Sequence, residues 1–260
     1  MNNPNIVVIS DYGTGDPAFT EVLLQLKSLM PNACIIPQST PAFSTINTGF
    51  WIYQIALTKN LKNTYIYSNT APRQKDHKAQ KNNKGEKLMW AKLDNNFEIM
   101  AVNADYVFSF VKSHIKDFRF VSVRNEGSQF RSRDNYPKSV SQMVNRDNNF
   151  LGQKAEIKDI PNEPKNVIAS IDGYGNIKTT IRQKEIVFKP GQVLSVKLNG
   201  QIHKAIYTDG VFNVENGKLA FAPGSSGHDN RFMELFVRGK NAYELFGKPR
   251  TEEKIEILEK

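Results

Sequence analysis

Residues 10–17 combine the residue types and the spacing of a ligand-binding turn. The apolar, β-branched run at residues 6–9 is typical of a strand buried on both faces. Asp11 ends this run, and two glycines follow within four residues. Asp16 stands before a proline and predicts a helix start, because Asp is a good N-cap and Pro suits the first helical position. A carboxylate at the end of a strand fits the edge where open α/β sheets bind ligands, and an ordinary βα turn has the same residues.

Composition describes a globular chain without a membrane segment. The 260 residues are 39% hydrophobic and 23% charged, and no stretch approaches the roughly 18 apolar residues of a membrane span. The N-terminus lacks the basic region of a signal peptide. Cys34 is the only cysteine, so no intramolecular disulfide can form, and its apolar surroundings predict simple packing. We expect a cytoplasmic protein that has no contact with a membrane.

The net charge of +9 raises the hypothesis of nucleic-acid binding. The basic residues are scattered, however, and only residues 73–87 concentrate them. This segment has almost no apolar residues and no interleaved aromatics, which a single-strand binding platform would need. It therefore predicts a solvated loop, and we expect no nucleic-acid partner.

The pattern of elements changes along the chain. Up to about residue 150, strands alternate with helices, which favours an α/β domain with a largely parallel sheet. Apolar periodicity predicts helices at residues 17–29, 46–57, 106–115 and 134–148, and a turn at residues 94–96 predicts a strand pair. Beyond a linker at residues 159–164, short strands separated by glycine turns predict a smaller all-β, barrel-like domain. We therefore predict an α/β nucleoside-binding domain at residues 1–158 and a β-barrel-like domain at residues 159–260.

Four short blocks, spread over nearly the whole chain, form a specific set. They are Ser-Asp-Tyr-Gly-Thr-Gly-Asp-Pro at 10–17, Phe-Arg-Ser-Arg-Asp at 130–134, Ile-Asp-Gly-Tyr-Gly-Asn-Ile at 171–177, and Gly-Ser-Ser-Gly at 224–227 followed by Arg-Gly-Lys-Asn-Ala at 238–242. In this order they resemble the S-adenosylmethionine hydroxide adenosyltransferases and their fluorinase and chlorinase relatives. The first resembles that family's Asp-Phe-Gly-Thr-x-Asp signature. The second resembles its Phe-His-Gly-Arg-Asp block, with Ser132 as in the halogenase version.

The resemblance implies a reaction and an assembly. Members of this family attack C5′ of the ribose of S-adenosylmethionine with water or halide and release methionine. The resemblance implies a small-molecule nucleoside ligand and no cofactor other than S-adenosylmethionine itself as substrate or ligand. It also implies a homotrimer whose ligand sites lie between the N-terminal domain of one subunit and the C-terminal domain of its neighbour.

The resemblance also implies a set of substrate-binding residues. Asp11 would hold the ribose hydroxyls, a role suited to a carboxylate that accepts two hydrogen bonds. Asp172 and Asn176 would hold the methionine end, although both also stand beside glycines and equally fit a plain turn. The remaining positions are Ser132, Tyr174 (beside the adenine, or else part of a core), Ser226, Asn241 and Ala242.

Three departures from the family fall on the catalytic positions. Hydrolytic members use an Asp, an Arg and a His to position and activate water. Ser68 stands in the place of this Asp, Lys75 is near the place of the Arg, and Arg131 replaces the His. Serine and arginine cannot act as a base at neutral pH, so these candidate catalytic residues form an altered triad.

Two functions of different classes follow from this reading. The first is an enzyme that cleaves S-adenosylmethionine, with water or hydroxide as nucleophile, to adenosine and methionine. The second is a catalytically impaired or inactive member that binds S-adenosylmethionine or adenosine as a sensor or scaffold. Because the positioned base is missing, we expect slow hydrolysis with adenosine binding retained.

Overall fold

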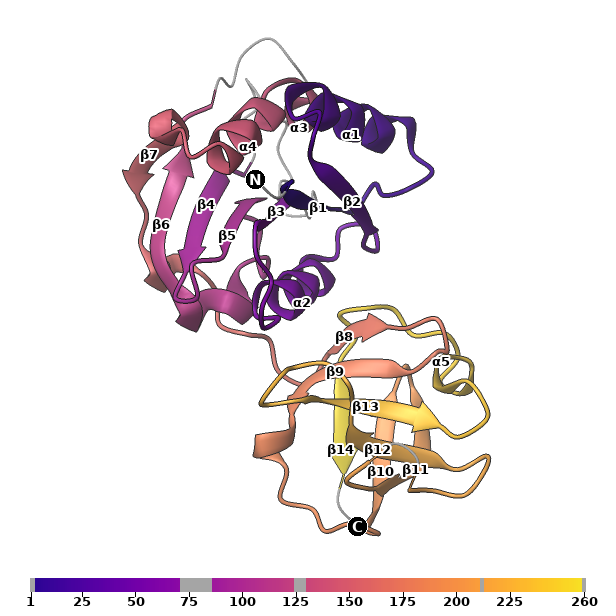
Figure 1. Cartoon of the computed structure of the whole chain (residues 1–260). Coiled ribbons are helices and arrows are strands. Elements are labelled where there is room, and N and C mark those ends of the chain that lie inside the picture. Colours follow the sequence, from indigo (N-terminus) through magenta and orange to yellow (C-terminus); the bar gives the residue numbers. More distant parts are fainter. Residues whose placement is uncertain (1–2, 71–85, 124–129, 211–212, 259–260) are drawn as a thin grey trace, which may run out of the picture. The chain divides into compact units, whose positions relative to one another are not determined.

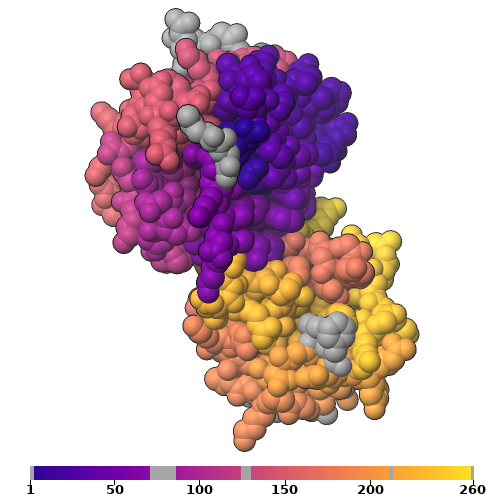
Figure 2. Space-filling model, viewed as in Figure 1, coloured from indigo at the N-terminus to yellow at the C-terminus, as the bar shows by residue number. Residues whose placement is uncertain are grey.

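The computed structural model describes residues 3–70, 86–123, 130–210 and 213–258, so the candidate Lys75 lies outside the described residues. The chain divides into two compact units, Met1–Asn162 and Glu163–Lys260 (Figure 1). The boundary predicted from the sequence lies four residues earlier, at the end of residue 158. In the space-filling view each unit is made from one continuous part of the chain (Figure 2).

The N-terminal unit is built on a seven-stranded sheet of mixed direction. Its strand order is β2-β1-β3-β5-β4-β6-β7. The strands β2, β1, β3 and β5 are parallel to one another, whereas β4, β6 and β7 each pair antiparallel with their neighbours. Their bounds are β1 Asn5–Ser10, β2 Cys34–Ser39, β3 Thr64–Asn69, β4 Leu88–Leu93, β5 Glu98–Val102, β6 Ile115–Val121 and β7 Leu151–Lys154.

The helices of this unit lie on both faces of the sheet. The helices α1, α3 and α4 contact one another, and α2 contacts the 3-10 helix η1 on the other face (Figure 1). The predicted helix start at Asp16 is confirmed, since its side chain accepts the N–H of Ala18 at 2.7 Å. The bounds are α1 Pro17–Leu29, α2 Thr45–Ala56, α3 Arg131–Asp134 and α4 Tyr136–Val144, with 3-10 helices η1 Ser109–His114, η2 Asn148–Phe150 and η3 Ile157–Asp159.

The C-terminal unit is a second seven-stranded sheet, ordered β14-β10-β11-β12-β13-β9-β8. Its pairs are antiparallel except for β11 and β12. A bridge between Val167 and Lys254 connects the approaches to the two edge strands, so the sheet curls into a half-barrel around an apolar core. The bounds are β8 Ile168–Ile171, β9 Ile177–Arg182, β10 Val193–Leu198, β11 Gln201–Tyr207, β12 Leu219–Pro223, β13 Phe232–Val237 and β14 Ile255–Leu258, with η4 Gln183–Glu185 and α5 Ala242–Leu245.

The predicted fold class, a largely parallel α/β domain followed by an all-β domain, is wrong. The chain is mostly β, with two mixed or mostly antiparallel sheets and few helices. The hairpin at residues 94–96 turns the chain back after β4, and β6 and β7 then add antiparallel neighbours. The strands β4 and β5 are buried on both faces, as parallel strands usually are, so their apolar runs do not reveal their direction. The predicted helix at residues 106–115 is instead the 3-10 helix η1 and the turn before it.

Two further expectations concern membrane-spanning segments and the environment of Cys34. Within the described residues, no helix combines the length and the apolar composition needed to cross a membrane. Cys34, which we expected to be packed, is exposed at the start of β2, an edge strand of its sheet.

Candidate functional site

The carboxyl ends of β1, β2 and β3 meet at one edge of the N-terminal sheet. Ser10, the last residue of β1, is level with Ser39 of β2 on one side and with Asn69 of β3 on the other. The chain therefore leaves β1 toward one neighbour and later returns to its other side. In open sheets with parallel strands, ligands commonly bind outside the strand ends at such a change of direction.

The turn after β1 is fastened to both neighbouring strands. Gly13 has a φ of +48°, and a Cβ on it would lie 2.5 Å from Ser39 Oγ. This close approach lets Thr14 donate its N–H to Ser39 Oγ at 2.8 Å. On the other side, Ser10 donates its hydroxyl to the carbonyl oxygen of Asn69 at 3.1 Å. The backbone of the turn thus has a fixed position relative to three strand ends.

Asp11 is half-buried at the start of this turn. Its Oδ2 accepts the backbone N–H of Phe43 at 3.0 Å, and Phe43 adopts a left-handed φ of 64° before α2. Next to it, the ring of Tyr12 packs edge-on against Phe19 and Phe130, with centroid distances of 5.7 and 5.8 Å. Tyr12 thereby connects residues 10–17 with residues 130–134, two blocks that are far apart in sequence.

The block at residues 130–134 forms α3 and continues this contact. The Ser132 side chain is buried, and its carbonyl oxygen accepts the hydroxyl of Tyr67 at 3.0 Å. Burial, with smaller contributions from Tyr12 and Tyr136, raises the pKa of Tyr67 well above 10.0, so this hydroxyl stays a neutral donor. The guanidinium of Arg131 lies over the ring of Tyr136, 5.8 Å from its centroid.

The altered triad does not assemble a base in the described residues. Ser68 is the penultimate residue of β3 and is completely buried. Among the described residues, its Oγ has no hydrogen-bond partner. Arg131 is half-buried at the start of α3, and nothing can be said of Lys75. No three His, Cys, Asp or Glu side chains in the described parts of the chain could hold a metal ion together.

In the C-terminal unit, Asp172 organises the turn between β8 and β9. Its Oδ1 accepts the N–H groups of Tyr174 and Asn176, both at 3.0 Å. Its Oδ2 accepts Asn176 Nδ2 at 3.0 Å and lies 3.6 Å from Lys178 Nζ. The carboxylate is therefore occupied by donors of its own loop. Tyr174 at the tip is 83% exposed, so it is not part of the core of its unit.

A buried ion pair supports this loop from β9 and β13. Lys178 Nζ lies 2.6 Å from Glu234 Oε1, and both residues are almost inaccessible to solvent. A Cβ on Gly224 would collide with the Glu234 carboxylate, which explains why a glycine stands there. Lys178 is not recognisable from the sequence pattern, because its partner is 56 residues away and buried lysines are rare.

The terminal block packs against the same loop. Asn241 caps α5 by accepting the N–H of Glu244 at 2.9 Å, and its side chain leaves no room for a Cβ on Gly175, whose φ is +79°. Ala242 is fully buried. Ser226 is buried in the turn between β12 and β13, where its carbonyl oxygen accepts the N–H of Phe232 at 2.9 Å. The structure thus brings Asp172, Asn176, Asn241 and Ala242 together.

Comparison with known proteins identifies relatives in structure only. No protein-family model and no curated protein matches the chain. An uncharacterized conserved protein from Thermotoga maritima is similar, with a TM-score of 0.75, 16% identity and coverage of 97% of this chain and 99% of the other. A conserved hypothetical protein from Thermus thermophilus has a TM-score of 0.69, 15% identity and coverage of 98% and 100%. The shared feature is the fold of the whole chain.

Proposed function

We propose that this chain is a divergent member of the S-adenosylmethionine hydroxide adenosyltransferase family. It binds S-adenosylmethionine and cleaves it at ribose C5′ to adenosine and methionine. The observation that carries the proposal is the meeting of two sequence blocks, residues 10–17 and 130–134, at the carboxyl edge of β1 and β3. A crevice at a change of chain direction is where a nucleoside is expected.

In this proposal Asp11 binds the ribose. The 2′ and 3′ hydroxyls are two adjacent donors, and a carboxylate can accept from both. The backbone N–H of Phe43 holds the carboxylate in place. The negative charge of Asp11 also attracts the sulfonium cation of the substrate and so favours its binding.

In the C-terminal unit, Asn176 is the better candidate for the methionine end. Its Oδ1 is buried and has no hydrogen-bond partner among the described residues, so an ammonium group that reaches it would satisfy this acceptor. Asp172 keeps the loop in shape, because its oxygens already accept from the loop itself. The exposed ring of Tyr174 offers a face to the adenine.

The proposed reaction is a displacement at C5′. A water or hydroxide oxygen forms a bond to C5′ while the C5′–S bond breaks, methionine leaves with its sulfur neutral, and the extra proton passes to solvent. Arg131 can attract an anionic nucleophile but cannot remove a proton. Loss of a positioned base lowers rates by about 10²–10⁴-fold, so turnover should be slow.

A second candidate function is binding without turnover, as a sensor or scaffold. The complete burial of Ser68 favours it, because no base faces the substrate from this position. Single-turnover incubation with S-adenosylmethionine, followed by chromatography for adenosine and methionine, separates the two. Slow release of both products supports cleavage, and binding without release supports the second candidate.

The ribose contact is tested by a matched pair of variants. Asp11→Asn should weaken adenosine binding by about 1.5–3 kcal/mol, the contribution of hydrogen bonds to a charged group. Asp16→Asn removes the same charge five residues away but keeps the helix cap, so its affinity should be unchanged. Equal dissociation constants for both variants in calorimetry would remove Asp11 from the site.

The proposed assembly is a homotrimer with ligand sites shared between subunits. Light scattering at micromolar concentration should give three times the 29.5 kDa mass of the chain. A strictly monomeric protein would contradict shared sites, because Asp11 of one subunit could then not share a ligand with Asn176 of another.

A further inference from the structure

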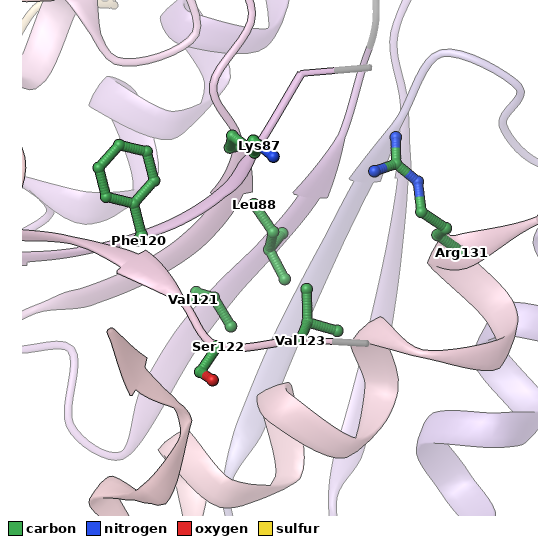
Figure 3. Close-up of a pocket in the computed structure, with 7 residues that line it drawn as sticks. All are labelled: Lys87, Leu88, Phe120, Val121, Ser122, Val123 and Arg131. Atoms are coloured by element: carbon green, nitrogen blue, oxygen red, sulfur yellow. The ribbon is translucent and has the colours of Figure 1, made fainter. Parts of the chain in front are cut away.

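A small pocket lies on the N-terminal sheet, where β4 begins and the neighbouring strand β6 ends. It has a volume of about 280 Å³, just below the roughly 300–1,000 Å³ typical of small-molecule sites. Leu88 is the first residue of β4, Val121 is the last of β6, and Arg131 begins α3. The pocket is lined by Lys87, Leu88, Phe120, Val121, Ser122, Val123 and Arg131 (Figure 3).

The pocket has an apolar side and a basic side. Leu88 and Val121 are buried, and together with Val123 they surround the space between the two strands (Figure 3). The nitrogens of Lys87 and Arg131 lie on the upper side of this view. Phe120 adds an aromatic ring that is 39% exposed. A ligand in this pocket thus meets hydrocarbon on one side and cations on the other.

The charge of the lining is positive. Among the described residues that line the pocket, two are cations and none carries a carboxylate. Glu86 precedes Lys87 in the sequence and is not among the residues that line the pocket.

We propose that this pocket binds a small monocarboxylate with a short apolar tail. The guanidinium of Arg131 and the ammonium of Lys87 supply two positive charges that attract a carboxylate. The apolar side chains take the tail out of water. An inorganic anion such as phosphate would leave this apolar surface unused. The inference goes beyond the proposed nucleoside function, with which the pocket shares Arg131.

Calorimetric titration with hexanoate and three reference compounds tests the chemistry of the ligand. Hexanol matches the tail without the charge, acetate matches the charge with a shorter tail, and inorganic phosphate is an anion without a tail. Hexanoate should bind about tenfold or more tightly than each of them, because one charged hydrogen bond or two buried methylenes correspond to about a factor of ten. Equal binding of hexanol, or tighter binding of phosphate, overturns the proposal. Adenosine is absent throughout, so hexanoate binding can be present or absent whatever the outcome of the adenosine titrations.

Variants with matched charge locate the site. Lys87→Gln should weaken hexanoate binding several-fold, whereas Lys116→Gln removes the same charge from an exposed position near the other end of β6 and should have no effect. Val123→Asp places a carboxylate in the lining at a half-buried position and should abolish binding while the melting temperature shows a folded protein. Equal affinities for the two lysine variants, or unchanged binding by Val123→Asp, would overturn the location.

Discussion

The two Asp-containing turns, one in each unit, use similar residues in different ways. In the turn after β1, the hydroxyls of Ser10 and Ser39 hold the backbone, and Asp11 accepts from Phe43 beyond the turn. In the turn after β8, Asp172 itself holds the backbone with both of its oxygens. An aspartate can face a ligand when other groups satisfy the backbone donors of its turn. Asp172 therefore has a positioning role in its own loop, and binding of the ribose by Asp11 belongs to the proposed function.

The largest expected effect concerns the ion pair behind the second turn. Glu234→Gln should lower the free energy of unfolding by about 3–5 kcal/mol, because it leaves the buried Lys178 without its nearest partner. Glu256→Gln removes the same charge from the exposed pair with Lys197 and should cost about 0–1 kcal/mol. Urea denaturation measures both. If both variants lost the same free energy of unfolding, the turn after β8 would not depend on the ion pair between Lys178 and Glu234.

A smaller effect separates two fully buried serines, Ser10 at the end of β1 and Ser68 near the end of β3. Ser10→Ala should cost about 1 kcal/mol, because it removes the hydrogen bond to Asn69. Ser68→Ala should leave stability unchanged or raise it by up to about 1 kcal/mol, because the Ser68 hydroxyl is buried without a partner among the described residues. Thermal and urea unfolding of both variants give the comparison. A loss in Ser68→Ala as large as that in Ser10→Ala would show that this hydroxyl has an unrecognised partner.

The smallest expected effect is a pH dependence at the first turn. Because the pKa of Tyr67 is raised in the folded state, its stabilising contribution is complete below pH 10 and decreases as the pH rises toward the folded pKa. Tyr67→Phe should make the alkaline loss of stability less steep and cost about 1 kcal/mol at pH 8, where the bond to Ser132 is lost. Unfolding at several values from pH 8 to 11 tests this. An unchanged slope would show that Tyr67 does not control it.

The sequence by itself determined the features that depend on neighbouring residues. The cap at Asp16 with Pro17 starts α1, and the turn at residues 94–96 joins the antiparallel pair β4 and β5. These interactions extend over a few residues, so the local pattern contains the whole cause. The glycine turns of the C-terminal unit are local in the same way.

Only the tertiary structure decided the direction of the strands and the state of each polar group. Buried strands appear in the sequence as apolar runs whether their neighbours are parallel or antiparallel, so the antiparallel pairing of β6 and β7 could not be recognised. The pairing of Lys178 with Glu234, and the position of Arg131 beside Lys87, join residues that are distant in sequence. Whether Asp11, Asp172 or Ser68 can serve a ligand depends on which donors and acceptors the fold brings to it, because a polar group satisfied by its own loop has no capacity left for another partner.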